Sequence, residues 1–252
     1  MDYKRYYQEC KSIYDGEWNG AEPLDSLTIR TSKEDGFVPD NYDRYISNIS
    51  DYVYKKYETK SDLFGLDHPN IVRLDNYKDC DEIVSLGNHF GKWLEENTYN
   101  SPCIVEAVLI YKNLANKVER SSWIWHYDNN IREQLKLMVY LSDVGENNGA
   151  FEVIMKDGKG ARPLTLTNDS RVSQSDILKY EEMGWKRTPI VGKRGTLCLF
   201  DPNCVHRATT PTEEPHRIAI VYNFRPYHQN VDKRVDKSWT RTWSNLGNIK
   251  KY

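Results

Sequence analysis

Two apolar runs joined by a polar turn form the centre of the chain. Residues 134–155 read QLKLMVYLSDVGENNGAFEVIM, and within them Gln134–Leu141 and Ala150–Met155 have the length and composition of β-strands. The turn between the runs is rich in Asn, Gly and acidic residues, which favour chain reversal. We therefore predict two strands here.

Similar runs on both sides extend this pattern. They are Ile104–Tyr111, Ser122–His126, Thr188–Val191, Thr196–Phe200, Val205–Ala208 and Arg217–Phe224. Short strands separated by polar turns are typical of a sandwich or a barrel. One helix, around Ser173–Met183, is expected to interrupt them. The pattern predicts a mainly β core.

The first hundred residues have a different periodicity. Tyr42–Tyr57 and Asp79–Tyr99 repeat apolar residues at helical spacing, which predicts two helices with one buried face each. The polar stretch 225–252 carries seven Lys and Arg against two Asp. We expect a single domain over 1–252, with a mostly helical flanking region (1–100), a β core (101–226) and a C-terminal extension (227–252).

Composition narrows the possible functions. The 35 Lys and Arg against 37 Asp and Glu give a net charge of −2, whereas proteins that bind bulk nucleic acid usually carry a basic excess. No apolar run approaches the roughly 20 residues of a membrane span, and the first residues contain no signal sequence. We therefore expect a cytoplasmic protein without a membrane partner. The 5 cysteines contain no C-x-x-C pair and fit neither a disulfide framework nor a zinc finger.

Two histidines and an aspartate occupy informative positions. In Trp123-Ile-Trp-His-Tyr-Asp128, residues His126 and Asp128 stand two apart and therefore share one face of a predicted strand. His206 begins a later strand and could approach them across a closed sheet. Two imidazoles and one carboxylate are the set that holds Fe(II) while leaving positions open for a co-substrate and O₂. Because H-x-D also occurs by chance, the surrounding residues determine how strongly this motif indicates a metal site.

Arg217 follows His206 by eleven residues and heads an apolar strand. Since an unpaired buried charge is costly, this arginine requires a partner, and a carboxylate that accepts two hydrogen bonds is the natural one. The carboxylate could belong to an acidic side chain at the rim or to a ligand. With the three candidate metal ligands present, we favour a ligand.

These residues lie within motifs of a known family. From about Ile104 to Pro226, the sequence resembles the iron(II)/2-oxoglutarate-dependent dioxygenases, and within them the phytanoyl-CoA dioxygenase family. The spacing between His206 and Arg217 also matches that family. The segments that carry the resemblance are Trp125-His-Tyr-Asp128, Leu137-Met-Val-Tyr-Leu-Ser-Asp143, Glu146-Asn-Asn-Gly-Ala-Phe151, Gly195-Thr-Leu-Cys-Leu-Phe-Asp201, His206-Arg-Ala208 and Arg217.

The resemblance implies a double-stranded β-helix, or jelly-roll, core with flanking N-terminal α-helices. It implies that His126, Asp128 and His206 bind Fe(II), and that Arg217 binds the distal carboxylate of 2-oxoglutarate. The implied reaction uses 2-oxoglutarate and O₂ as co-substrates and hydroxylates a C–H bond of a small molecule, with release of succinate and CO₂.

One position departs from the family pattern. The second residue after the distal histidine is often a hydroxyl donor to the keto acid, whereas this chain has Ala208 there. Another donor to 2-oxoglutarate is therefore needed. The candidates are Tyr140, Asn113, Gln134 and Thr209.

Other functions remain open. A protein hydroxylase of the prolyl-hydroxylase type shares the Tyr140-Leu141 pair and a start similar to His126-Tyr-Asp-Asn129. A catalytically inactive jelly-roll binding module is a second alternative, although all four residues of the proposed site are present. Oxidative demethylation of nucleic acid would require a basic groove, for which the charged tail is the only support. The carboxylate of Asp128 argues for hydroxylation and against halogenation.

Overall fold

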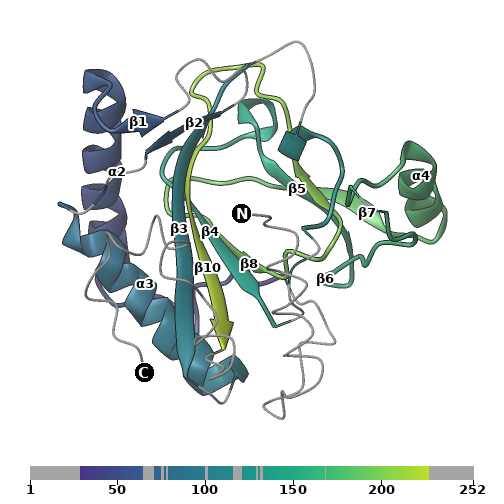
Figure 1. Cartoon of the computed structure of the whole chain (residues 1–252), viewed down its shortest axis with the longest axis horizontal. Helices are drawn as coiled ribbons and strands as arrows, with labels where there is room; N and C mark the ends of the chain where they lie inside the picture. Colours follow the sequence, from purple (N-terminus) through teal and green to yellow (C-terminus); the bar gives the residue numbers. More distant parts are fainter. Residues whose placement is uncertain are drawn as a thin grey trace.

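Two antiparallel β-sheets form the centre of the molecule, and helices cover the larger one (Figure 1). This computed structural model describes residues 29–64, 71–74, 77, 79–99, 102–115, 121–128, 130, 133–167 and 169–226. The larger sheet has the order β1-β2-β3-β10-β4-β8, and the smaller has the order β6-β5-β7 with β9 paired to β5. The arrangement confirms the predicted mainly β, jelly-roll core with N-terminal helices. The expected C-terminal extension, 227–252, lies outside the described residues.

Seven of the eight predicted runs are strands. The larger sheet consists of β1 (Leu63–Phe64), β2 (Ile71–Leu74), β3 (Cys103–Asn113), β4 (Leu135–Tyr140), β8 (Leu197–Phe200) and β10 (Ile218–Pro226). The smaller sheet consists of β5 (Phe151–Lys156), β6 (Lys159–Gly160), β7 (Lys186–Ile190) and β9 (His206–Ala208). The helices are α2 (Tyr42–Thr59), α3 (Asp81–Leu94) and α4 (Gln174–Glu182). Strands β1 and β2 were not predicted, and they extend the larger sheet from within the first hundred residues, which were expected to be mostly helical.

The prediction of a strand over Ser122–His126 was wrong. Ser121–Trp123 form a single 3-10 turn, and His126 pairs with other segments only through isolated bridges. The backbone N–H and C=O of His126 are both bonded to His206, at 3.0 and 2.9 Å. These two hydrogen bonds fix the backbone of His126, and with it the starting point of its side chain. The composition of Ser122–His126 does not distinguish such an isolated bridge from a strand.

Alternation along β4 separates the hydrophobic core into two parts. Leu135, Leu137 and Val139 belong to the part that packs against α2 and α3. Met138 and Tyr140 belong to the part enclosed between the two sheets. Because successive strand residues point to opposite faces, the inner face of the larger sheet is available to build a pocket.

Helix α3 packs on the outer face of the larger sheet, against β3 and, through Gly87 and Gly91, against β10 (Figure 1). A Cβ atom at Gly87 would come within 2.9 Å of the ring of Tyr222, so a side chain at this position would force the helix away. The Tyr222 hydroxyl donates a hydrogen bond to the carbonyl oxygen of Ile83 at 3.0 Å. This close contact anchors the strand that begins beside Arg217.

The segment before α2 closes one edge of the fold. Arg30 exchanges backbone hydrogen bonds with Leu199 of β8, at 3.0 and 2.9 Å. The neighbouring Ile29 N–H donates to the carbonyl oxygen of Gly158, which precedes β6 of the smaller sheet. These two residues therefore connect the edges of both sheets.

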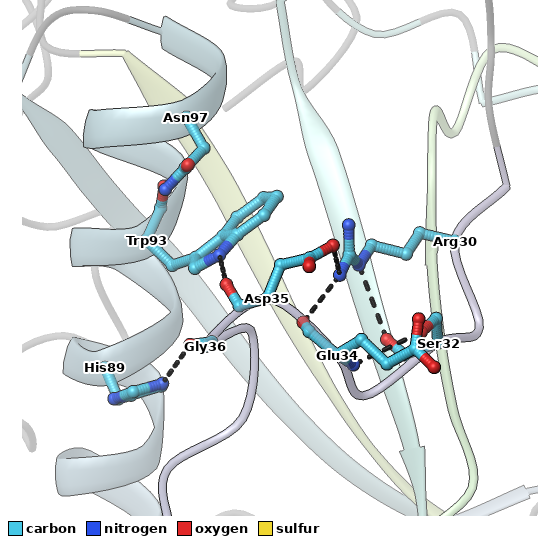
Figure 2. Close-up of polar contacts among 8 residues, drawn as sticks. All are labelled: Arg30, Ser32, Glu34, Asp35, Gly36, His89, Trp93 and Asn97. Carbon is cyan, nitrogen blue, oxygen red and sulfur yellow. Dashed lines mark hydrogen bonds and ion pairs between the residues drawn. The ribbon is translucent and has the colours of Figure 1, made fainter.

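The same segment is attached to α3 (Figure 2). The Arg30 guanidinium lies over the rings of Phe37 and Trp93, at 4.8 and 5.0 Å from their centroids. Figure 2 shows the Trp93 indole N–H donating to the Asp35 carbonyl oxygen and the His89 ring nitrogen bonded to the Gly36 carbonyl oxygen. Stacking and hydrogen bonds hold the turn on the helix.

Four cysteines fall within the described residues, and all are buried free thiols, namely Cys80, Cys103, Cys198 and Cys204. This agrees with the absence of a disulfide pattern in the sequence. Among the described helices, none is both long enough and apolar enough to cross a membrane.

Candidate active site

Strand β9 and the segment before β4 bring His126, Asp128 and His206 together. One ligand atom from each of the three residues lies within 4.8 Å of the others. The Nε2 atoms of His126 and His206 are 3.7 and 4.0 Å from the carboxylate oxygens of Asp128. His126 and His206 are direct partners in an antiparallel bridge, so their rings lie side by side with centroids 4.3 Å apart.

Hydrogen bonds fix the tautomer of both imidazoles. Nδ1 of His126 lies 2.8 Å from the Ile124 carbonyl oxygen, and Nδ1 of His206 lies 2.8 Å from the Cys204 carbonyl oxygen. A carbonyl oxygen can only accept, so each Nδ1 must carry the proton. In both rings, this leaves the lone pair on Nε2, the atom that faces Asp128. Metal-binding histidines are usually oriented in this way.

A turn between β8 and β9 positions Asp128. The Asp128 backbone N–H donates to the Pro202 carbonyl oxygen at 2.9 Å. The Asn203 side-chain amide bonds both backbone groups of Asn130, accepting from its N–H at 2.7 Å and donating to its C=O at 3.2 Å. The ion pair of Asp201 with Arg162 (3.0 Å) holds the turn itself. Asn203 is therefore a positioning residue that the sequence did not single out.

Burial and charge set the protonation of the triad. Burial, and then the neighbouring His206, lower the pKa of His126 to about 3, and burial also lowers the pKa of His206. Burial would raise the pKa of Asp128, but Lys136 and the two imidazoles outweigh it, so this pKa lies well below its ordinary value. Two neutral imidazoles and one carboxylate are the donor set for a divalent cation.

Lys136 is the closest charged neighbour of the triad. Its Nζ lies 2.5 Å from Oδ2 of Asp128, and the two side chains are 19% and 22% exposed. Lys136 is on β4, where it faces the space between the sheets together with Met138. The ammonium group thus compensates the carboxylate in the metal-free protein.

A pocket of about 320 Å³ opens beside the triad. Its walls come from both sheets and from the segments before β4 and α4. The lining side chains include Leu109, Tyr111, Lys136, Met138, Phe151, Arg171, Phe200, Ala208, Arg217 and Val221 together with the triad. Ligand pockets are typically apolar concavities with a few polar groups, at volumes of roughly 300–1,000 Å³.

Arg217 is buried at the inner side of this pocket, with a side-chain exposure of 1%. Its Nη1 atom lies 3.4 Å from the Met138 sulfur, and its guanidinium is 5.6 Å from the centroid of the Tyr111 ring. Its Nε atom has no hydrogen-bond partner, and none of the described carboxylates forms an ion pair with it. A buried arginine in this state is poised for an anionic ligand.

The family model for phytanoyl-CoA dioxygenase (PhyH) matches residues 93–218, which is half of the 252 residues. The chain belongs to the phytanoyl-CoA dioxygenase family. The matched range contains every residue of the triad as well as Arg217. No curated protein matches the chain.

Several solved structures share the fold of this chain at low sequence identity. The epimerase SnoN from nogalamycin biosynthesis, in complex with Fe³⁺, α-ketoglutarate and nogalamycin RO, is 12% identical with a TM-score of 0.57, over 88% of this chain and 84% of SnoN. EctD from S. alaskensis, with 2-oxoglutarate and 5-hydroxyectoine, is 13% identical with a TM-score of 0.55, over 85% and 80% of the two chains. HygX from Streptomyces hygroscopicus, with nickel, 2-oxoglutarate and hygromycin B, is 13% identical with a TM-score of 0.51, over 87% of each chain.

None of the four candidate donors to the co-substrate lines the pocket. The Tyr140 hydroxyl donates to the Ile190 carbonyl oxygen at 2.6 Å and accepts from the Phe151 N–H at 3.2 Å. Burial raises the pKa of Tyr140 to about 12, although the adjacent Arg217 acts to lower it. Thr209 donates its hydroxyl to the Ala150 carbonyl oxygen at 3.2 Å.

Asn113 and Gln134 differ from these two hydroxyl groups because they retain unused polar atoms. Nδ2 of Asn113 and both amide atoms of Gln134 are buried without a hydrogen-bond partner. Asn113 ends β3 beside the start of β10, where its backbone N–H donates to the Arg217 carbonyl oxygen at 2.9 Å. Gln134 precedes β4. Their role toward a co-substrate stays a prediction.

Proposed function

We propose that this family member oxidises a C–H bond of a small molecule, with Fe(II) and O₂, and with 2-oxoglutarate as the second co-substrate. His126, Asp128 and His206 would hold the iron, and Arg217 would bind the distal carboxylate of 2-oxoglutarate. The observation that carries this proposal is the convergence of two Nε2 atoms and one carboxylate within 4.8 Å, at a pocket that also contains a buried arginine.

The donor set fits iron on grounds of this structure alone. Both imidazoles present Nε2 in the deprotonated state because their Nδ1 protons are used in bonds to carbonyl oxygens. These three residues would hold the iron and would leave further coordination positions open toward the pocket that they line. When bound, the iron and the keto acid supply the oxidising chemistry, with succinate and CO₂ as co-products.

The residues of the chain provide binding and orientation. The bridge between His126 and His206 fixes the spacing of their rings, and the turn at Pro202 and Asn203 fixes Asp128. Phe151 and Phe200 flank the ring of His206 at 5.4 and 5.5 Å between centroids. These apolar neighbours restrict access of water to one side of the site, which limits side reactions.

The shape of the pocket supports a small-molecule substrate. A volume of about 320 Å³ accommodates a compact molecule beside the co-substrate contacts more readily than a polypeptide segment. SnoN, EctD and HygX have been crystallised with small molecules, which agrees with this substrate class. Hydroxylation of a protein remains the alternative, and a cytoplasmic location remains a prediction from the sequence.

Succinate formation tests the proposal. Protein purified without oxygen would receive Fe(II), 2-oxoglutarate and then O₂, and wild type should form succinate slowly even without its main substrate. His206→Ala should form none. His216→Ala is the matched control, since His216 lies outside the pocket and pairs with Glu214 at 3.4 Å.

A second measurement covers the case in which the enzyme forms succinate only after its main substrate has bound. Calorimetry should show that wild type binds Ni(II), a redox-stable replacement, and that bound Ni(II) strengthens the binding of 2-oxoglutarate. Absence of both succinate and metal binding in wild type, or equal succinate formation by His206→Ala, would contradict the assignment.

A further inference from the structure

The proposed co-substrate site lacks a second donor from the protein. Ala208 has no side-chain hydrogen bond to offer, and none of the four candidate donors lines the pocket. The hydroxyl groups of Tyr140 and Thr209 donate to backbone carbonyl oxygens instead. A donor that lines the pocket and lies beside the triad fits this role better.

Lys136 has both of these properties. It lines the pocket, and its Nζ atom is 2.5 Å from Oδ2 of Asp128. Its backbone lies within β4, where it is opposite Asn223 of β10 on one side and Phe200 of β8 on the other. Since the strands on both sides fix its backbone, the ammonium group is positioned before any ligand binds, which reduces the entropic cost of binding.

The inner face of β4 leads from the triad to Arg217. Lys136 and Met138 stand two apart and share this face, with a separation of about 6.8 Å along the strand. The Met138 sulfur is 3.4 Å from Nη1 of Arg217, and Arg217 is also adjacent to Tyr140, the next residue on this face. Lys136 and the guanidinium of Arg217 therefore lie on opposite sides of Met138. A five-carbon acid with a carboxylate at each end has a length that suits this spacing.

The ammonium group of Lys136 can serve two carboxylates. It carries three N–H donors, and within the described residues only Asp128 bonds it. An α-keto acid offers its keto oxygen and the neighbouring carboxylate to a metal ion together, so this carboxylate would approach the metal beside Asp128. Two carboxylates at one site repel each other, and a cation bonded to both lowers this repulsion.

We propose that Lys136 binds the carboxylate next to the keto group of 2-oxoglutarate, while Arg217 binds the distal carboxylate. This inference rests on the proposed function, which assigns Arg217 and the metal to the co-substrate. Lys136 would then supply the contact that Ala208 cannot make. The two cations would have separable tasks, since Lys136 recognises the keto-acid end and Arg217 recognises the length of the chain.

The test compares 2-oxoglutarate with 2-oxobutanoate, which keeps the keto-acid end and lacks the distal carboxylate. Calorimetry would measure the binding of each to protein saturated with Ni(II). Wild type should bind both, and 2-oxobutanoate more weakly. Lys136→Met should weaken the binding of both acids at least tenfold and by a similar factor. Arg217→Met should weaken the binding of 2-oxoglutarate and leave that of 2-oxobutanoate within twofold of wild type.

A neutral ligand separates direct binding from an effect on the metal site. Imidazole can occupy the open positions of Ni(II) without a carboxylate, so its binding to Lys136→Met should stay within twofold of wild type. Lys193→Met is the matched control, since Lys193 forms an exposed ion pair with Asp143 and does not line the pocket. Lys136→Gln also removes the charge but keeps a hydrogen-bond donor, and it replaces Lys136→Met if that variant folds poorly.

Three results would overturn the inference. The first is unchanged binding of 2-oxobutanoate by Lys136→Met, and the second is an equal loss of imidazole and 2-oxobutanoate binding, which would mean that Lys136 acts only through Asp128. The third is wild type that binds 2-oxoglutarate but not 2-oxobutanoate. Failure of the proposed function has a different signature, since wild type would then bind neither Ni(II) nor 2-oxoglutarate.

Discussion

Replacement of Lys136 by Met should destabilise the metal-free protein and leave the metal-loaded protein much less affected. The Lys136 ammonium lies 2.5 Å from the Asp128 carboxylate. At an effective dielectric constant of about 20, their gross attraction is about 7 kcal/mol, most of which is offset by desolvation. Hydrogen bonds to charged groups contribute about 1.5–3 kcal/mol net, so we expect the free energy of unfolding to fall by that amount.

The corresponding change in melting temperature is measurable. In a domain of this size, 1 kcal/mol corresponds to roughly 2–4 °C, so the metal-free variant should melt about 3–12 °C below wild type. Saturating Ni(II) should reduce this deficit, because the divalent cation takes the place of the lysine as the counter-charge of Asp128. In Lys136→Met, the metal also binds Asp128 without competition from an ammonium group.

A second ion pair provides the matched control. Lys193 lies 2.9 Å from Asp143, with side chains 89% and 54% exposed, so Lys193→Met should cost at most about 1 kcal/mol with or without metal. Thermal melts of the three proteins with and without Ni(II) compare the two pairs. An unchanged melting temperature of metal-free Lys136→Met, or the same deficit in both states, would refute the reasoning.

Three further predictions concern the same pocket. Arg217→Met should weaken equilibrium binding of 2-oxoglutarate at least 100-fold with metal binding retained, because a buried carboxylate would lose its partner; calorimetry checks this, and unchanged affinity would exclude Arg217 as the contact. Asn203→Ala should lower the affinity for Ni(II) about 10–100-fold without changing any ligand, as expected when a group that orients the ligands is lost. Without metal, the free energy of unfolding should fall as the pH drops below 6.5 toward about 3, because the unfolded chain then binds a proton that buried His126 resists; denaturant titrations should show a flatter profile for His126→Gln.

The parts of the site that are close in sequence were predictable. His126 and Asp128 stand two apart, and the motif around them together with the spacing to Arg217 indicates the family. The structure brings His126, Asp128 and His206 together as the sequence predicted. Seven strands were also predictable, with their ends to within two residues, because polar turns separate the apolar runs.

Other features depend on contacts that no local pattern encodes. Ser122–His126 have the composition of a strand, yet within this run only His126 forms β-bridges, one with Arg171 and one with His206. Lys136 alternates with apolar residues along β4, and only the register of the sheet brings it to Asp128. Arg171 lies 45 positions after His126 in the chain and becomes its neighbour through a bridge that composition does not indicate.

The outer face of the larger sheet packs against helices, whereas its inner face lines the pocket. Its outer face and the helices share one apolar cluster, in which Gly87 permits the close contact of α3 with Tyr222. Its inner face supplies Lys136 and Arg217 to the pocket. Because strand residues alternate between the faces, a substitution such as Gly87→Ala would displace the helix from β10 and act on stability first. A substitution of Lys136 or Arg217 on the inner face would instead act first on the pocket and on the three residues beside it.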